Sequence, residues 1–372
     1  MKKSLEKKNC IYYIILLIIF FTSYIPIMLG NKVGIYKFII NIKKGNIIFL
    51  IGLTLILFFL EYKNNIKRDI KIIFLIIIFT IFLRNLYVSF FLLIISSFIE
   101  REERLKSILL LLSFSYILTL IFYFLGFLDC NIYGIRDYGE YEIFRNSLGF
   151  VHPNTTMSLL FPIFSLLYYL YYPKYKYIII SFILIVGKII FDLTYSRTTF
   201  LLIILFLILI LIKDKYIKKL KYLFLMEGII IEFLTFYLPI YFKNTILDEV
   251  FSGRLRFYYY YLSKCKMTLL GNENVRIFYE KYFLDSSYLQ LLFENGIIGF
   301  SMLTILISFG MYIFFENKDY RAIRIFSIIL IFGFMEQAAF FYYFNVVYFI
   351  ISDYIFDKEN VNRRISWKKK LF

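Results

Sequence analysis

The sequence predicts an all-α polytopic membrane protein with about twelve transmembrane helices (ten to twelve) and two long outer loops. Its 372 residues are 61% hydrophobic, with a mean hydropathy of +0.73, whereas soluble domains are close to half apolar. Apolar runs with few charges recur along the chain, and several approach the roughly 20 residues that a helix needs to cross a bilayer. Strand-like alternation is absent along these runs, and lipid accepts only helices or closed barrels as spanning elements.

The predicted spans follow the apolar runs in chain order. They are 11–29, 47–60, 70–83, 86–99, 107–127, 153–171, 177–194, 198–212, 221–240, 287–313, 321–335 and 339–356. The third and fourth runs are short, which is why the predicted count extends down to ten. No soluble domain, linker or repeat divides the chain, so we expect residues 1–372 to form a single integral membrane domain. Lysines precede the first run without a cleavage site after it, which indicates an uncleaved span.

The distribution of charge predicts the orientation. The net charge is +17, and most of the 43 basic residues fall in segments that this topology places in the cytoplasm. Such a positive-inside bias orients a membrane protein without any polyanion, so we expect no nucleic-acid partner. Both termini are predicted to be cytoplasmic, and the two long loops, 128–152 and 241–286, are predicted to face outward.

The cysteines and the histidine exclude several kinds of site. Cys10, Cys130 and Cys265 show no metal-binding spacing, and one histidine is too few for a zinc site built from His and Cys. Cys130 and Cys265 both lie in predicted outer loops, so a disulfide between them stays open, with unpaired thiols as the simpler interpretation. The cytoplasmic connections contain no glycine-rich nucleotide loop. We therefore expect no metal and no cofactor, and chemistry that faces outward.

The motif RNSLGFVHPN (145–154) contains the only histidine of the chain. Pro153 suits the first turn of a helix, which places His152 and Asn154 at the mouth of a span. Imidazole titrates near neutrality, so His152 is a candidate general base or a hydrogen-bond donor to a leaving phosphate. The alternative is a histidine that merely starts a helix at the membrane interface.

The motif TYSRTTF (194–200) is a polar break between two apolar runs. The turn must be tight, so Ser196 and Arg197 stay close to the outer surface. The planar fork of arginine binds phosphate through two hydrogen bonds, and Arg145 is a further outward arginine. The alternative for Arg197 is a side chain that snorkels at a helix end.

Two motifs occupy the second long loop and the span that follows it. SGRLRFYYYYL (252–262) combines Arg254 and Arg256 with four tyrosines, a mixture that suits a lipid-phosphate-sugar ligand better than an ion. LDSSYLQLLFENGIIGF (284–300) places Asp285 and Tyr288 at the outer mouth and Glu294 deeper, where acidic residues are functional candidates. The alternatives are interfacial tyrosines and a helix cap at Asp285.

Together with LLGNEN (269–274), these motifs stand in an order and spacing that resemble the polysaccharide polymerase (Wzy) and O-antigen ligase superfamily. The resemblance covers roughly residues 105–350 and is that of a short capsular or O-antigen polymerase. GFMEQAAFFYYFN (333–345) is similar to the last helical hairpin of the superfamily. RLRFYYYYL departs from the pattern, because relatives often place a tryptophan there.

The resemblance implies a metal-independent glycosyltransferase of the bacterial cytoplasmic (inner) membrane. It would transfer glycan from undecaprenyl pyrophosphate to the terminal sugar of another lipid-linked repeat unit, with His152 and Asp285 as catalytic residues. The residues implied to bind the pyrophosphate or the sugars are Arg197, Arg254, Arg256, Arg145, Asn154, Ser196 and Tyr288. The implied partners are the lipid-linked oligosaccharide, membrane lipid, and a chain-length regulator and flippase of the same pathway.

Three other functions remain open from the sequence. An O-antigen ligase would perform the same chemistry on a different acceptor. A glycosyltransferase that uses polyprenyl-phosphate sugars usually carries acidic residues in its first outer loop, and residues 31–46 contain none. A flippase or transporter would place paired charges near the bilayer midplane, often in repeated halves, and the sequence shows no repeat.

Overall fold

The computed structural model describes part of the chain. The described residues are Tyr13, Leu83, Leu86, Ser89, Leu92, Leu93, Ser96, 99–128, 132–137, 142–272, 284–341 and 343–356. Two compact units divide the chain: Met1–Asp69 with Ile94–Ile204, and Ile70–Leu93 with Leu205–Phe372. Nearly all of the predicted spans 11–29, 47–60 and 70–83, more than half of 86–99, and the predicted cytoplasmic termini lie outside the described residues.

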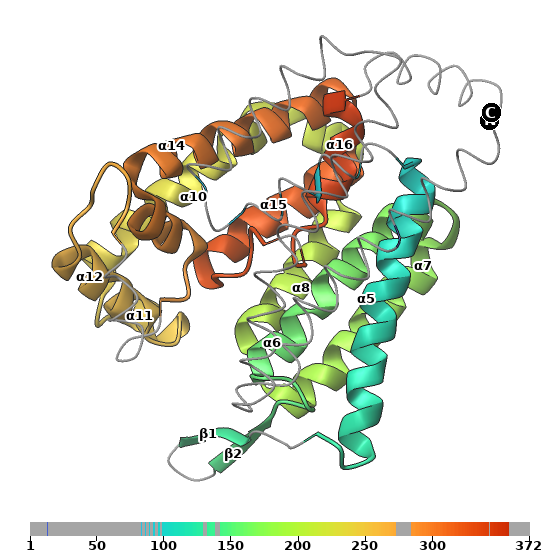
Figure 1. Ribbon diagram of the computed structural model, residues 1–372, viewed down its shortest axis with the longest axis horizontal. Coiled ribbons are helices and arrows are strands. Elements are labelled where there is room, and N and C mark those ends of the chain that lie inside the picture. The colour runs from blue at the N-terminus through green and yellow to red at the C-terminus, as the bar shows by residue number, and fades with distance from the viewer. Residues whose placement is uncertain are drawn as a thin grey trace. The chain divides into compact units, whose positions relative to one another are not determined.

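The first unit contains α5 (Arg101–Phe124), a 24-residue helix that is long and apolar enough to cross a membrane. It corresponds to the predicted span 107–127. α5 packs beside α7 (Leu160–Thr194), as Figure 1 shows. The hydroxyl of Tyr116 on α5 donates to the carbonyl of Thr156 over 3.1 Å and joins α5 to the short helix α6 (Pro153–Ser158).

The helical stretch from α6 to the end of α7 is a folded-back pair rather than one rod. It covers 42 residues, which is roughly 63 Å at about 1.5 Å per residue, twice the roughly 30 Å of a bilayer core. Tyr175, two residues after Pro173, leaves the helical conformation. The rings of Phe164 and Phe182 lie 6.2 Å apart, although 18 residues of straight helix would separate them by about 27 Å. The chain therefore reverses near Tyr175, in agreement with the predicted spans 153–171 and 177–194.

The loop before α6 contains strands that the all-α prediction missed. β1 (Ile132–Asp137) and β2 (Glu142–Asn146) pair antiparallel, with Tyr133 opposite Arg145. The two segments are rich in aromatic and β-branched residues, which favour strands. They lie outside the apolar runs on which the fold class was predicted.

A tight turn connects α7 to α8 (Arg197–Leu211). Tyr195 adopts a left-handed conformation, and its N–H donates to the carbonyl of Phe191 over 2.7 Å. Only Tyr195 and Ser196 separate the two helices. The polar break predicted at 194–200 is thus a two-residue turn.

The second unit is built on α10 (Lys221–Phe242), α14 (Ser287–Glu316) and α15 (Tyr320–Met335), which pack on one another (Figure 1). α16 (Val347–Phe356) packs on α14 and α15. It begins later than the predicted start at residue 339, because the described residues between α15 and α16 form turns. The short helix α9 (Asp214–Lys219) precedes α10, and buried Arg324 of α15 donates to the carbonyls of Leu209 and Ile212 at the end of α8.

The second long loop carries two short helices, α11 (Ile246–Val250) and α12 (Arg254–Lys264). Its segment 268–272 then inserts beside a break in α14 at Gly296. The N–H of Ile297 donates to the carbonyl of Thr268 over 3.0 Å, and the N–H of Asn272 donates to the carbonyl of Phe293 over 2.8 Å. The loop therefore supplies partners for backbone groups that the break releases, as irregular backbone at membrane depth requires.

Four helical stretches of the described residues are long and apolar enough to cross a membrane: Arg101–Phe124, Pro153–Thr194, Lys221–Phe242 and Ser287–Glu316. These stretches confirm the helical membrane-protein class. The total of twelve spans, the orientation and the membrane of residence stay predictions.

Candidate functional site

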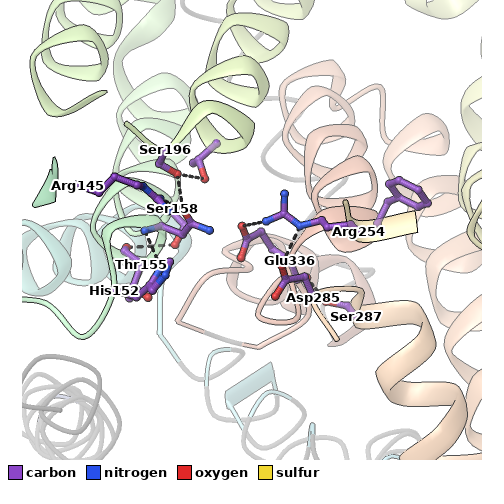
Figure 2. A network of polar contacts seen from close by, with 12 residues as sticks. Arg145, His152, Thr155, Ser158, Ser196, Arg254, Asp285, Ser287 and Glu336 are labelled. Carbon is purple, nitrogen blue, oxygen red and sulfur yellow. Dashed lines mark hydrogen bonds and ion pairs between the residues drawn. The ribbon is translucent and has the colours of Figure 1, made fainter. Parts of the chain in front are cut away.

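The first candidate cluster lies in the first unit and centres on Asn154. The amide oxygen of Asn154 accepts hydrogen bonds from Arg145 Nη2 over 2.5 Å and from Ser196 Oγ over 3.1 Å (Figure 2). Arg145 Nε also donates to the carbonyl of Thr194 over 3.2 Å. Asn154 thus joins the end of β2 to the α7–α8 turn. The structure brings together four predicted site residues: Arg145, His152, Asn154 and Ser196.

His152 is the residue that caps the N-terminus of α6. Its backbone is extended, and its Nδ1 accepts a hydrogen bond from the N–H of Asn154 over 3.1 Å. An imidazole that accepts at Nδ1 carries its proton at Nε2, and Nε2–H is then a donor. Proton uptake at Nδ1 would break the cap. The arrangement therefore favours His152 as a hydrogen-bond donor over a general base.

Arg197 differs from Arg145 in exposure. Arg145 is buried at 8% relative exposure, whereas Arg197, the first residue of α8, is exposed. Ser196 beside it is buried and also contacts Thr199 Oγ1 over 3.3 Å. An exposed guanidinium next to the Asn154 cluster suits the binding of an anion from solution.

The second candidate cluster lies in the second unit and centres on Arg254. Its Nε donates to Asp285 Oδ2 over 2.8 Å, and its Nη2 lies 3.5 Å from Glu336 Oε1 (Figure 2). The Arg254 side chain is 9% exposed, that of Asp285 28% and that of Glu336 14%. Burial disfavours the charged guanidinium, but the two carboxylates outweigh burial and raise the pKa of Arg254 above its ordinary value.

The end of α15 beside this cluster is held by hydroxyl groups. Ser287 Oγ donates to the carbonyl of Glu336 over 2.5 Å, and Tyr258 donates to the carbonyl of Phe334 over 2.9 Å. Burial raises the pKa of Tyr258 well above its ordinary value, so its hydroxyl remains a donor. These bonds satisfy carbonyls that a helix leaves without partners at its C-terminus.

The structure gives the contacts of two predicted site residues, Tyr288 and Asp285, around this helix end. Tyr288 is fully buried, and its hydroxyl donates to the carbonyl of Leu330 over 3.0 Å. It therefore packs inside the second unit, in the first turn of α14. The cap of α14 is Ser286, whose Oγ accepts from the N–H of Leu289 over 3.4 Å. Asp285 is the residue before the cap and is directed to Arg254 instead.

Arg256 pairs with a different carboxylate from those that Arg254 contacts. Its Nε lies 3.0 Å from Asp248 Oδ2, and its N–H donates to Asp248 Oδ1 over 3.2 Å. The Arg256 side chain is 60% exposed, while that of Asp248 is 3% exposed. Asp248 thereby caps α12, which begins after Gly253 without a capping side chain of its own.

Acidic side chains also lie within the helices of the second unit. Glu232 of α10 contacts Thr304 Oγ1 of α14 through both carboxylate oxygens, at 2.9 and 2.8 Å. Glu227 contacts Ser327 Oγ of α15. Buried Glu294 accepts from Gln290 Nε2 over 3.4 Å. These acids join helices or neighbouring turns and lie apart from the Arg254 contacts described above.

Two further observations concern an ion pair and the thiols. Lys188 and Asp192, four residues apart on α7, form an ion pair, as is common at this helical spacing. Cys265 is a buried free thiol, while Cys130 lies outside the described residues. No three side chains of His, Cys, Asp or Glu gather to hold a metal ion in the part of the chain that the structure describes.

Glu336 is the site residue that the sequence did not assign. The sequence places this acid at the end of an apolar run, in GFMEQAAFF, but the residues beside it in the chain do not predict a contact with Arg254. Glu336 lies 82 positions after Arg254, and two predicted spans, 287–313 and 321–335, lie between them. Only the packing of α12, α14 and α15 makes the cluster apparent.

The fold and the two clusters define a helical membrane protein with buried polar groups at the ends of its helices. Comparison with known proteins adds no assignment: no protein family, no curated protein and no solved structure matches the chain.

Proposed function

We propose that the protein is a polymerase of surface polysaccharide repeat units. It transfers glycan from undecaprenyl pyrophosphate to the terminal sugar of another lipid-linked unit, on the outer face of the bacterial cytoplasmic membrane. The observation that carries the proposal is the Asn154 cluster, in which Arg145 and His152 of RNSLGFVHPN and Ser196 of TYSRTTF gather at one helix start.

The chemistry of the transfer fits such a cluster. Pyrophosphate is a good leaving group, so catalysis mainly needs donors and positive charge where negative charge develops. In the proposal, His152 donates from Nε2 to the departing pyrophosphate. Exposed Arg197 binds a phosphate oxygen pair, and Arg145 holds Asn154 and the turn in place. No metal or cofactor takes part.

The Arg254 cluster has a different role in the proposal. Arg254 is engaged by Asp285 and Glu336, so we assign its charge to holding these carboxylates rather than to phosphate. Arg256 is a peripheral phosphate contact, because its exposed side chain already pairs with Asp248.

One observation favours a second class of function. Glu227 and Glu232 lie on a helix long enough to span the membrane, and acids at such depth often mark transport pathways. A flippase for lipid-linked oligosaccharide is therefore the alternative, alongside a ligase of the same chemistry.

The test is the surface polysaccharide of a deletion strain, separated on a gel. A polymerase predicts loss of the ladder with a single repeat unit retained on the surface. A ligase predicts a full-length polymer that is not attached to its acceptor. Loss of all surface glycan, with repeat units retained on the cytoplasmic face, would contradict the proposal and favour the flippase.

A further inference from the structure

A short basic segment joins α8 to α10 in the second unit. It includes the helix α9, and α10, which is long and apolar enough to cross a membrane, begins directly after it. The segment therefore lies next to the end of a candidate span, where lipid headgroups are found. Its exposed lysines are Lys213, Lys215, Lys218 and Lys219.

α9 is held against the rest of the second unit. Buried Arg324 of α15 donates to Asp214 Oδ1 over 2.7 Å and to the carbonyls of Leu209 and Ile212 just before α9. Ile217 of α9 is fully buried. A helix of six residues is not stable by itself, so these contacts keep α9 in place and fix the face that it exposes.

The exposed face of α9 concentrates positive charge. Lys215, Lys218 and Lys219 share one face, because residues three and four apart are neighbours on a helix. Ile217 points roughly to the opposite side, at 3.6 residues per turn. Like charges at this spacing repel one another, so an anion bound across the three ammonium groups would relieve the repulsion.

The acids around this segment are engaged by other cations. Asp214 Oδ1 lies 2.7 Å from Arg324 Nη2, and Glu316 at the end of α14 lies 3.4 Å from Lys221 Nζ. Among the residues that the structure describes, no acid pairs with the four lysines of the segment. Their charge therefore remains available to a partner.

Exposed apolar side chains adjoin the lysines and indicate what kind of anion fits. Tyr216, Leu220, Tyr222 and Leu223 are all exposed. Tyrosines are typical of the membrane–water interface, and lysine clusters beside a span attract anionic lipids. An anionic lipid can place its phosphate on the lysines and its chains on the apolar side chains, whereas a soluble anion would use the charges alone.

We propose that residues 213–219 bind the phosphate group of an anionic glycerophospholipid, with Lys215, Lys218 and Lys219 as the principal cations. Each lysine close to an anionic lipid surface contributes roughly fivefold in affinity. The binding involves no lipid-linked sugar, so its test is independent of the proposed function.

The experiment uses the purified full-length protein in neutral detergent, with dioctanoyl phosphatidylglycerol as the probe and native mass spectrometry to measure binding. Lys215→Gln combined with Lys219→Gln should weaken binding by roughly 25-fold. Lys264→Gln combined with Lys266→Gln is the matched control, because it removes two exposed lysines of the same unit, and binding should change little. Lys215→Arg combined with Lys219→Arg keeps the charge and should keep the binding.

The wild-type protein provides a test that needs no variant. Dioctanoyl phosphatidylcholine has the same chains and a phosphate but no net charge, so it should bind more weakly. Salt should weaken the binding of phosphatidylglycerol, because exposed charges are screened. Equal affinity for the two lipids would overturn the proposal.

Three further outcomes would also contradict it. Full binding by the glutamine pair at 215 and 219 would show that these lysines only orient the chain in the membrane. Equal losses in that pair and in the control pair would reduce the effect to net charge. Displacement of the lipid by an equal concentration of inorganic phosphate would identify a site for a soluble anion instead.

Discussion

The Nδ1 atom of His152 accepts a hydrogen bond from the backbone N–H of Asn154, two residues along the chain, over 3.1 Å. The same side chain therefore starts a helix and presents an Nε2–H donor. A mutation of His152 changes both properties unless the replacement is chosen to separate them.

His152→Asn makes that separation. Asparagine is among the best N-cap residues, so the start of α6 is retained, but its side chain is too short to replace the Nε2 donor. We expect normal protein levels and severely reduced polymer in a purified assay with lipid-linked repeat units. His152→Gln should keep measurable activity, because its amide reaches further, and His152→Ala should lose both the cap, about 0.5–2 kcal/mol, and the activity. Wild-type activity in His152→Asn would show that His152 is only a cap.

Arg254→Lys and Arg256→Lys form a matched pair in the same helix. A lysine ammonium lacks the planar fork with which the guanidinium reaches Asp285 through Nε and Glu336 through Nη2. We expect Arg254→Lys to lose polymer while Arg256→Lys stays close to wild type, because the Arg256 side chain is exposed, lysine keeps its charge, and the backbone N–H at this position still donates to Asp248. Removing the charge in Arg254→Ala should lower the free energy of unfolding by about 3–5 kcal/mol, as for other broken buried pairs. Ladders on polysaccharide gels and thermal stability in detergent measure the two effects, and equal ladders from both lysine variants would contradict the distinction.

Gly271 and Gly296 meet where the second loop enters the break of α14. Both have positive φ, and a Cβ on Gly271 would lie 2.1 Å from the carbonyl oxygen of Glu294. Gly271→Ala should therefore cost more than the roughly 1–3 kcal/mol of backbone strain alone, because backbone must also move. Gly126→Ala is the control, since Gly126 has φ +76° but nothing within 4 Å of the added Cβ. Thermal unfolding in detergent should show a larger loss for Gly271→Ala, and equal losses would rule out the docked loop.

The thiol of Cys265 predicts a pH dependence. Burial raises its pKa, so less thiolate is present at a given pH, and alkylation should require more alkaline solution than for an exposed thiol. The measurement is the iodoacetamide rate against pH in a variant with Cys10 and Cys130 replaced by serine. The denatured variant is the control and should react at lower pH. Coinciding profiles would contradict the burial of Cys265.

The sequence predicts local features of the site well and distant ones poorly. Pro153 after His152 predicts a helix start, and the structure has one there. The polar TYSRTTF predicts the turn that brings Ser196 to Asn154. The partners of Arg254 are 31 and 82 positions away, and only the packing of the second unit selects Asp285 and Glu336 among the available acids.

Two elements of the fold likewise could not be predicted from the local sequence. The hairpin of β1 and β2 lies in a polar loop, where a prediction based on long apolar runs has no information. The break of α14 lies inside FENGIIGF, which is apolar enough to predict a continuous span. The left-handed conformation of Gly296 depends on loop 268–272, and no local pattern specifies that contact.

Glu232→Gln separates a polymerase from a transporter. Both Glu232 oxygens lie within 2.9 Å of Thr304 Oγ1, and the amide of glutamine has the same shape and can still bond the hydroxyl, so the packing of α10 on α14 should survive. If the acid only joins these helices, the polysaccharide ladder should match wild type. A transporter that uses the charge of Glu232 should instead lose export, with repeat units retained on the cytoplasmic face. His152→Ala is the comparison, because a defective polymerase still shows single repeat units at the surface. Loss of surface units in Glu232→Gln, with protein level unchanged, would contradict the polymerase and support transport.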